Sequence, residues 1–104
     1  MEQFDVYRNS NPATSEVIPY LLDVQTDMLD ALATRVVVPL VTSGAMGKSA
    51  RRLNPEFEIG GILVIMSTAE LAGVSVRSLG EKVFSLREKR EEIIAALDLL
   101  FTGI

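Results

Sequence analysis

The alternation of apolar and polar positions along the chain predicts a domain built from about five or six short β-strands. In residues 3–8, Phe4 and Val6 share one face while Asp5 and Tyr7 share the other, which is the period of a half-buried strand. Other stretches rich in β-branched and apolar residues give the same prediction. The predicted strands are residues 3–8, 17–24, 35–41, 53–59, 62–68 and 74–79.

Turn-forming residues divide the predicted strands. Gly60 and Gly61 supply the positive φ angles that a tight hairpin needs, so we expect the strands on either side of them to pair. Pro39 cannot donate a hydrogen bond to a sheet, so it predicts an edge position or a bulge inside the third strand. Residues 25–32 predict a loop with one helical turn, and residues 42–52 predict a loop.

The final segment predicts one amphipathic helix. Ser85 and Glu88 have the spacing of a capping box, which satisfies free backbone N–H groups where a helix begins. Gly103 stands where the end of a helix commonly needs a left-handed residue. Apolar residues recur at helical spacing and predict a single stripe along this helix. The stripe consists of Leu86, Ile93, Ile94, Leu97, Leu100 and Phe101.

Composition limits the chemistry that is open to the chain. Its 104 residues fit a single domain, residues 1–104. There is no cysteine, which excludes disulfides and thiolate metal sites, and no histidine, which removes the commonest general base and metal ligand. Any catalysis would therefore have to use carboxylates, lysine, arginine, tyrosine or hydroxyl groups. A formal net charge of −4 disfavours direct binding of nucleic acid and favours a protein partner.

The sequence also bears on location. Residues 1–5 are acidic and mixed, unlike the start of a secretory signal. The most apolar stretches, residues 36–47 and 59–69, are about a dozen residues long, whereas a membrane-spanning helix needs about 20. We therefore expect a cytoplasmic protein without a membrane segment.

Clustered acidic residues raise the question of a metal site or an acid–base pair. Asp23, Asp27 and Asp30 lie close together in the sequence, and Glu91 and Glu92 are adjacent on the predicted helix. The spacing of a calcium loop is absent. A solvated turn and a solvated helix face are therefore the favoured interpretation of these residues.

Two further features could bind a partner. Lys48, Arg51 and Arg52 form a small basic group that could contact phosphate or an acidic peptide, although a solvated loop is the favoured interpretation. At the C-terminus, Ile104 stands beside a free carboxylate. This apolar tip either folds back onto the core or anchors in the pocket of a partner.

Four collinear blocks of the chain resemble the CcdB toxin family, and the resemblance runs from Phe4 to Ile104. The blocks are residues 19–27, residues 34–40, residues 52–55 ahead of 57–59, and residues 93–104. The resemblance implies an antiparallel sheet of the SH3-like barrel kind, shared with the MazF and Kid toxins, with one C-terminal helix. It implies a homodimer that binds the DNA gyrase A subunit and traps the cleaved-DNA complex. Since this action is binding without turnover, we expect no catalytic residue, no metal and no cofactor. It also implies a CcdA-type antitoxin whose disordered segment folds on the toxin.

The resemblance further implies which residues bind gyrase. They are Asp98, Thr102, Gly103 and Ile104 at the C-terminus, and Thr26 and Met28 after the second strand. The best-known plasmid-borne member of the family has Trp in place of Thr102 and Asn in place of Asp98. That Trp stacks on an Arg of gyrase, a cation–π contact worth roughly 0.5–2 kcal/mol that Thr cannot supply.

Two other functions stay open. A MazF-like mRNA endonuclease would share the fold, but it would need a basic groove and an acid–base set, which the net charge and the lack of histidine disfavour. The third possibility, kept open by Thr102, is a CcdB homologue that has lost gyrase poisoning. Unopposed expression in bacteria distinguishes these functions.

Overall fold

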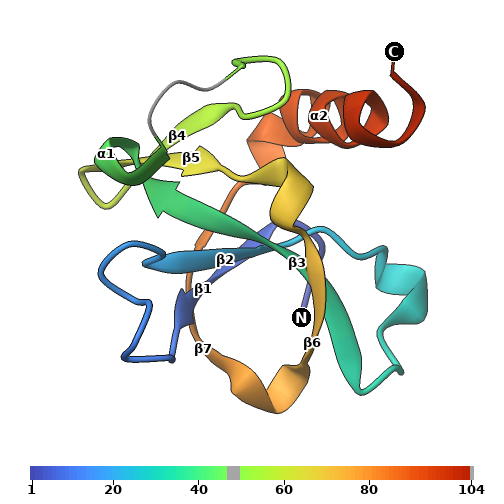
Figure 1. The fold of residues 1–104 in the computed structure, drawn as a ribbon. Helices are drawn as coiled ribbons and strands as arrows, with labels where there is room; N and C mark the ends of the chain where they lie inside the picture. Colours follow the sequence, from blue (N-terminus) through green and yellow to red (C-terminus); the bar gives the residue numbers. More distant parts are fainter. Residues whose placement is uncertain (47–49, 104) are drawn as a thin grey trace.

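A curled antiparallel sheet with one C-terminal helix forms the fold (Figure 1). The structure, a computed structural model, describes residues 1–46 and 50–103. The strand order is β4-β5-β3-β2-β1-β7, and β6 pairs with β3. The elements are β1 (Asp5–Asn9), β2 (Tyr20–Asp23), β3 (Thr34–Thr42), α1 (Ser43–Met46), β4 (Glu56–Ile59), β5 (Ile62–Met66), β6 (Ala72–Ser75), β7 (Leu79–Ser85) and α2 (Arg90–Thr102). This half-barrel with one C-terminal helix confirms the predicted fold class.

Strand β3 connects the two parts of the sheet. One of its edges pairs with β2 from Val37 to Leu40. Its other edge pairs with β6 up to Val37 and with β5 from Leu40 onward. Pro39 lies in the gap between these two partners, and its carbonyl accepts a hydrogen bond from the Ser67 N–H at 2.9 Å. The predicted edge or bulge is therefore wrong: Pro39 is tolerated inside a central strand because its missing N–H falls where the partner strand changes.

The predicted hairpin is confirmed between β4 and β5. Gly60 has φ +58° and Gly61 has φ +82°, and they join the paired residues Ile59 and Ile62. A two-residue turn of this kind requires both of its residues to take positive φ, which glycine adopts without strain.

The hydrophobic core lies inside the curl of the sheet. Helix α2 contributes Ile93 and Ala96, both fully buried. The guanidinium of Arg90, at the first turn of α2, lies 5.7 Å from the centroid of the Phe4 ring and covers that side of the core. The predicted apolar stripe is wrong at its last residue, because Phe101 is 68% exposed.

Residues 74–85 differ from the prediction. The predicted strand 74–79 is divided, since β6 ends at Ser75 and β7 begins at Leu79 after a 3-10 turn. Strand β7 was not predicted because it lies at the edge of the sheet, where no alternation of polar and apolar residues is needed. Its Gly80 lies against β1, and a Cβ there would be 2.7 Å from the carbonyl oxygen of Arg8.

The predicted start of the C-terminal helix is also wrong. Helix α2 begins at Arg90, after a 3-10 turn at residues 87–89, and no side chain caps it. The Ser85 hydroxyl instead accepts a hydrogen bond from the Arg87 N–H at 3.3 Å. A short 3-10 turn therefore stands where the sequence predicted the capping box.

The other predicted elements are present with adjusted bounds. Strands β2 and β4 are shorter than predicted, and the helical turn expected in residues 25–32 is the 3-10 turn Asp27–Leu29. The predicted loop 42–52 contains the short helix α1. Within residues 1–46 and 50–103, no helix is long and apolar enough to cross a membrane.

Candidate functional site

The end of α2 presents three of the predicted gyrase-binding residues to solvent. Asp98, Thr102 and Gly103 are all exposed. Gly103 has φ +76°, and its N–H donates to the Leu99 carbonyl at 3.0 Å, which confirms its prediction as the residue that ends the helix. The Thr102 hydroxyl donates to the Asp98 carbonyl at 2.7 Å, so this side chain folds back on the helix. The fourth predicted residue, Ile104, lies outside the described residues.

Thr26 and Met28 lie on the 3-10 turn that follows β2. The Thr26 hydroxyl accepts a hydrogen bond from the Met28 N–H at 3.3 Å and so caps the turn. The Met28 side chain is 90% exposed, and the nearby Leu29 and Leu32 are about half exposed. The turn therefore presents an exposed apolar surface, a property common in residues that contact a partner.

A buried ion pair holds this turn on the sheet. Arg35 and Asp23 are 1% and 0% exposed, and the Arg35 Nε–H donates to Asp23 Oδ2 at 2.8 Å. Arg35 Nη2 also lies 2.6 Å from the same oxygen, donates to the Gln25 carbonyl at 3.2 Å, and lies 3.7 Å from Asp27 Oδ1. The predicted solvated turn is therefore wrong for Asp23, because Arg35 compensates the buried carboxylate.

Burial raises the pKa of Asp23, and the hydrogen bonds that the carboxylate accepts from Arg35 and from the Gln25 N–H oppose this rise. Gln3 adds to the anchoring of the turn. The Gln3 N–H donates to Asp27 Oδ1 at 2.7 Å, and the Gln3 side chain donates to the Val24 carbonyl at 3.0 Å. The position of the turn thus depends on a polar network beneath it.

A second buried polar group lies on β1. Asp5 and Tyr7 are 2% and 6% exposed, so the predicted polar face of this strand is buried. The Tyr7 hydroxyl donates to Asp5 Oδ2 at 3.3 Å, and Lys82 Nζ of β7 lies 3.2 Å from Asp5 Oδ1. Burial, followed by the charge of Asp5, raises the pKa of Tyr7 to about 12. Tyr7 is therefore protonated at neutral pH and serves as a hydrogen-bond donor.

The structure does not bring the two predicted gyrase-binding segments together within one chain. Figure 1 shows the C-terminal end of α2 and the 3-10 turn after β2 at separate places on the molecule. Each of the two segments is exposed. Asp27 and Asp30 are exposed as predicted, and the described residues contain no acidic cluster that could hold a metal ion.

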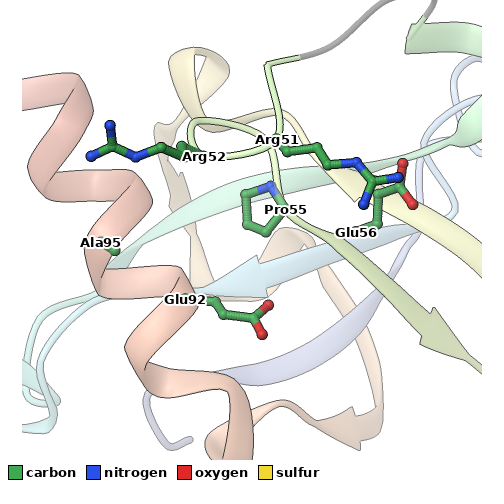
Figure 2. Close-up of a pocket in the computed structure, with 6 residues that line it drawn as sticks. All are labelled: Arg51, Arg52, Pro55, Glu56, Glu92 and Ala95. Atoms are coloured by element: carbon green, nitrogen blue, oxygen red, sulfur yellow. The ribbon is translucent and has the colours of Figure 1, made fainter.

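A cleft of about 470 Å³ lies between α2 and the segment that leads into β4. Figure 2 shows Glu92 and Ala95 on α2, and the other four lining residues on the segment across the cleft. Those four residues are Arg51, Arg52, Pro55 and Glu56. Two residues of the predicted basic group, Arg51 and Arg52, therefore lie at this cleft. The third, Lys48, lies outside the described residues. Sequence reasoning missed this cleft, because its walls are 36 or more residues apart in the chain, and no local spacing marks it.

The chain is thus a mainly β protein, with a curled antiparallel half-barrel sheet followed by one C-terminal helix whose end is exposed. The profile of the CcdB protein family matches residues 3–103, and the chain belongs to this family. The fold is also similar to that of an endoribonuclease solved in complex with its cognate antitoxin, from a mycobacterial species. That similarity has a TM-score of 0.71 at 16% sequence identity, over 94% of this chain and 91% of the other.

Proposed function

We propose that the chain is the toxin of a type II toxin–antitoxin pair that binds the DNA gyrase A subunit and traps the cleaved-DNA complex. The observation that carries this proposal is membership of the CcdB family along residues 3–103. That membership supports a toxin of a toxin–antitoxin system. Gyrase as the target, a homodimer as the active form and the cytoplasm as the place of action are our further steps.

The end of α2 is the surface that we propose contacts gyrase. Gly103 ends the helix in a left-handed turn, and Phe101, at 68% exposed, stands beside it. An exposed apolar residue at a rigid helix end can enter a pocket of the partner with little loss of conformational entropy. Because this action is binding alone, the proposal includes no catalytic residue and no cofactor.

The proposal includes a CcdA-type antitoxin that removes the toxin from gyrase. A disordered segment that folds as it binds can cover a large surface, and it can therefore compete with a second partner. The exposed apolar turn with Met28 and Leu29 is one surface that such a segment could cover.

An endoribonuclease is the second candidate, because the similar solved structure is described as one. In this chain, Arg51 and Arg52 could hold a phosphate, and Glu92 across the cleft could act as a base. The net charge of −4 makes the binding of a long RNA unfavourable, which is why we prefer gyrase.

The substitution Thr102→Trp tests the gyrase proposal. Thr102 is exposed and bonds only within its own helix, so the fold tolerates the change. An added cation–π contact of about 0.5–2 kcal/mol should lower the toxin concentration that gives half-maximal DNA cleavage by gyrase roughly 2- to 30-fold. The measurement is gyrase-dependent cleavage of supercoiled plasmid by purified protein.

The matched control is Glu16→Trp, which adds the same side chain at another exposed position. We expect gyrase to cleave the plasmid at the same concentration of Glu16→Trp as of the unchanged chain. With a chain that lacks Gly103 and Ile104, we expect no cleavage. Absence of gyrase-dependent cleavage by the unchanged chain and by Thr102→Trp would contradict gyrase as the target. Cleavage of RNA at defined sites by the same preparation would favour the endoribonuclease.

A further inference from the structure

Among the described residues, strand β4 forms one end of the sheet and pairs only with β5. The two-residue turn makes Ile59 and Ile62 a hydrogen-bonded pair, and in an antiparallel ladder such pairs recur at every second residue. The backbone of Phe57 therefore bonds to β5, as does the Pro55 carbonyl, which accepts from the Met66 N–H at 2.9 Å. Glu56 and Glu58 alternate with these bonded residues, so their backbone N–H and C=O groups point away from β5.

The outward-pointing backbone groups of Glu56 and Glu58 form a free edge on β4. No hydrogen bond joins their backbone groups to another element within residues 1–46 and 50–103. A free strand edge of this kind is a template on which a further strand can pair.

A groove follows this free edge. Pro55 and Glu56 line the cleft of about 470 Å³ opposite Glu92 and Ala95 of α2, as Figure 2 shows. Farther along β4, its next two residues line a smaller hollow of about 130 Å³ opposite the end of β7 and the turn before α2. Four consecutive residues, 55–58, thus form one wall, and the facing wall comes from elements that do not pair with β4.

We propose that this groove binds an extended segment of a partner polypeptide, which adds to the sheet as a strand along the free edge of β4. Strand addition of this kind gains affinity from main-chain hydrogen bonds and specificity from alternate side chains. Glu56 and Glu58 would supply the main-chain groups. The inference rests on the geometry of this edge alone, and it holds whether or not the chain binds gyrase.

The charges of the groove indicate the chemistry of the segment. The Glu56 and Glu58 side chains are exposed on the outer face of β4, whereas Phe57 is buried on the inner face. Basic residues should therefore stand beside the two glutamates, and apolar residues should alternate with them and face the core. An acidic residue should stand at the end of the segment near Arg51 and Arg52.

A second copy of the chain fits this edge poorly. Pairing two β4 strands about a two-fold axis would place Glu56 and Glu58 of one copy beside the same glutamates of the other. Like charges opposite each other on neighbouring strands destabilise a sheet. A separate basic and apolar segment is therefore the occupant that we propose.

Hydrogen exchange followed by NMR tests this proposal on the full chain. The probes are two eight-residue peptides of alternating valine and lysine, one with aspartate at its N-terminal end and one with aspartate at its C-terminal end. With one of them in millimolar excess, exchange of the Glu56 and Glu58 amides should slow at least about tenfold, because each becomes hydrogen-bonded. The Phe57 and Ile59 amides, already bonded to β5, should not change. Unchanged exchange at Glu56 and Glu58 with both peptides would overturn the proposal.

Substitutions at the edge sharpen the test. Glu58→Pro removes an outward N–H, and proline is tolerated on an edge strand where the N–H faces solvent. We expect peptide binding to weaken about tenfold for Glu58→Pro but only about twofold for the control Glu58→Gln, which keeps the N–H. Ala95→Trp fills the cleft from an exposed position on α2 and should also weaken binding. Equal affinities of all variants for the peptide would overturn the proposal. Protection of the Glu56 and Glu58 amides that appears without peptide and rises with protein concentration would also overturn it, because the occupant of the edge would then be a second copy of the chain.

Discussion

The buried ion pair beneath the 3-10 turn Asp27–Leu29 gives the sharpest prediction about stability. Replacing Arg35 by Met removes the charge and keeps a long unbranched side chain. The change leaves the Asp23 carboxylate, at 0% exposed, without its cation and without the hydrogen bond that Arg35 Nε donates at 2.8 Å. Removing one partner of a buried pair costs about 3–5 kcal/mol of the free energy of unfolding. A domain of this size has roughly 5–15 kcal/mol in total, so the loss is a large part of its stability.

The assay is urea unfolding at one fixed protein concentration, because the proposed dimer would make stability depend on concentration. The comparison is the double variant Asp23→Asn with Arg35→Met. Asn keeps an oxygen that accepts from the Gln25 N–H, which donates at 3.0 Å to Asp23 Oδ1. Since it leaves no buried charge, the double variant should be more stable than Arg35→Met alone by about 2 kcal/mol.

The pH dependence of Arg35→Met supplies a second readout. Burial raises the pKa of Asp23, and the variant loses the Arg35 contact that opposes this rise. The folded variant therefore binds a proton more strongly than the unfolded chain, so its stability is greatest at low pH and falls as pH rises through the folded pKa. The loss caused by the substitution should be larger at pH 7 than at pH 5. A loss below about 1 kcal/mol at pH 7, or a double variant less stable than the single one, would refute the reasoning.

Two further predictions concern β1 and β7. The pKa of Tyr7 is raised to about 12 in the folded chain, so this tyrosine ionises first in the unfolded chain. The free energy of unfolding should therefore fall by about 1 kcal/mol by pH 11. Tyr7→Phe should abolish this loss, and an equal loss in that variant would contradict the assignment. Gly80→Ala should cost about 1–3 kcal/mol, because the new Cβ would lie 2.7 Å from the Arg8 carbonyl oxygen. The control Gly73→Ala, whose Cβ meets open space, should change stability by less than about 1 kcal/mol in the same thermal unfolding experiment.

Local patterns predicted those parts of the fold that local physics determines. Gly60 and Gly61 require positive φ in their own turn, and Gly103 requires it at the end of its own helix, so a few neighbouring residues were sufficient. Strand β7 could not be found in this way. It is held by β1, which lies far away in the sequence, and its exposed edge imposes no alternation.

The candidate sites show the same division. Asp98 and Thr102 lie off the predicted apolar stripe and are exposed, but their role still rests on family resemblance. The pairing of Asp23 with Arg35 was missed because each residue alone is typical of a solvated position. The groove beside β4 was missed since it exists only once α2 is placed against the sheet. Contacts between distant segments therefore account for most of what the sequence left open.

The pairing of β1 with β7 has a consequence for synthesis on the ribosome. Strand β1 is made well before β7, yet Asp5 pairs with Ser85, and Lys82 is the cation beside the buried Asp5 carboxylate. Until β7 has left the exit tunnel, β1 has an open edge and an uncompensated acidic group, so a nascent chain can hold only part of its sheet. A product that stops before Leu79 should be short-lived in the cell, and the ability to bind any partner should arise only after β7 has been made and has paired with β1.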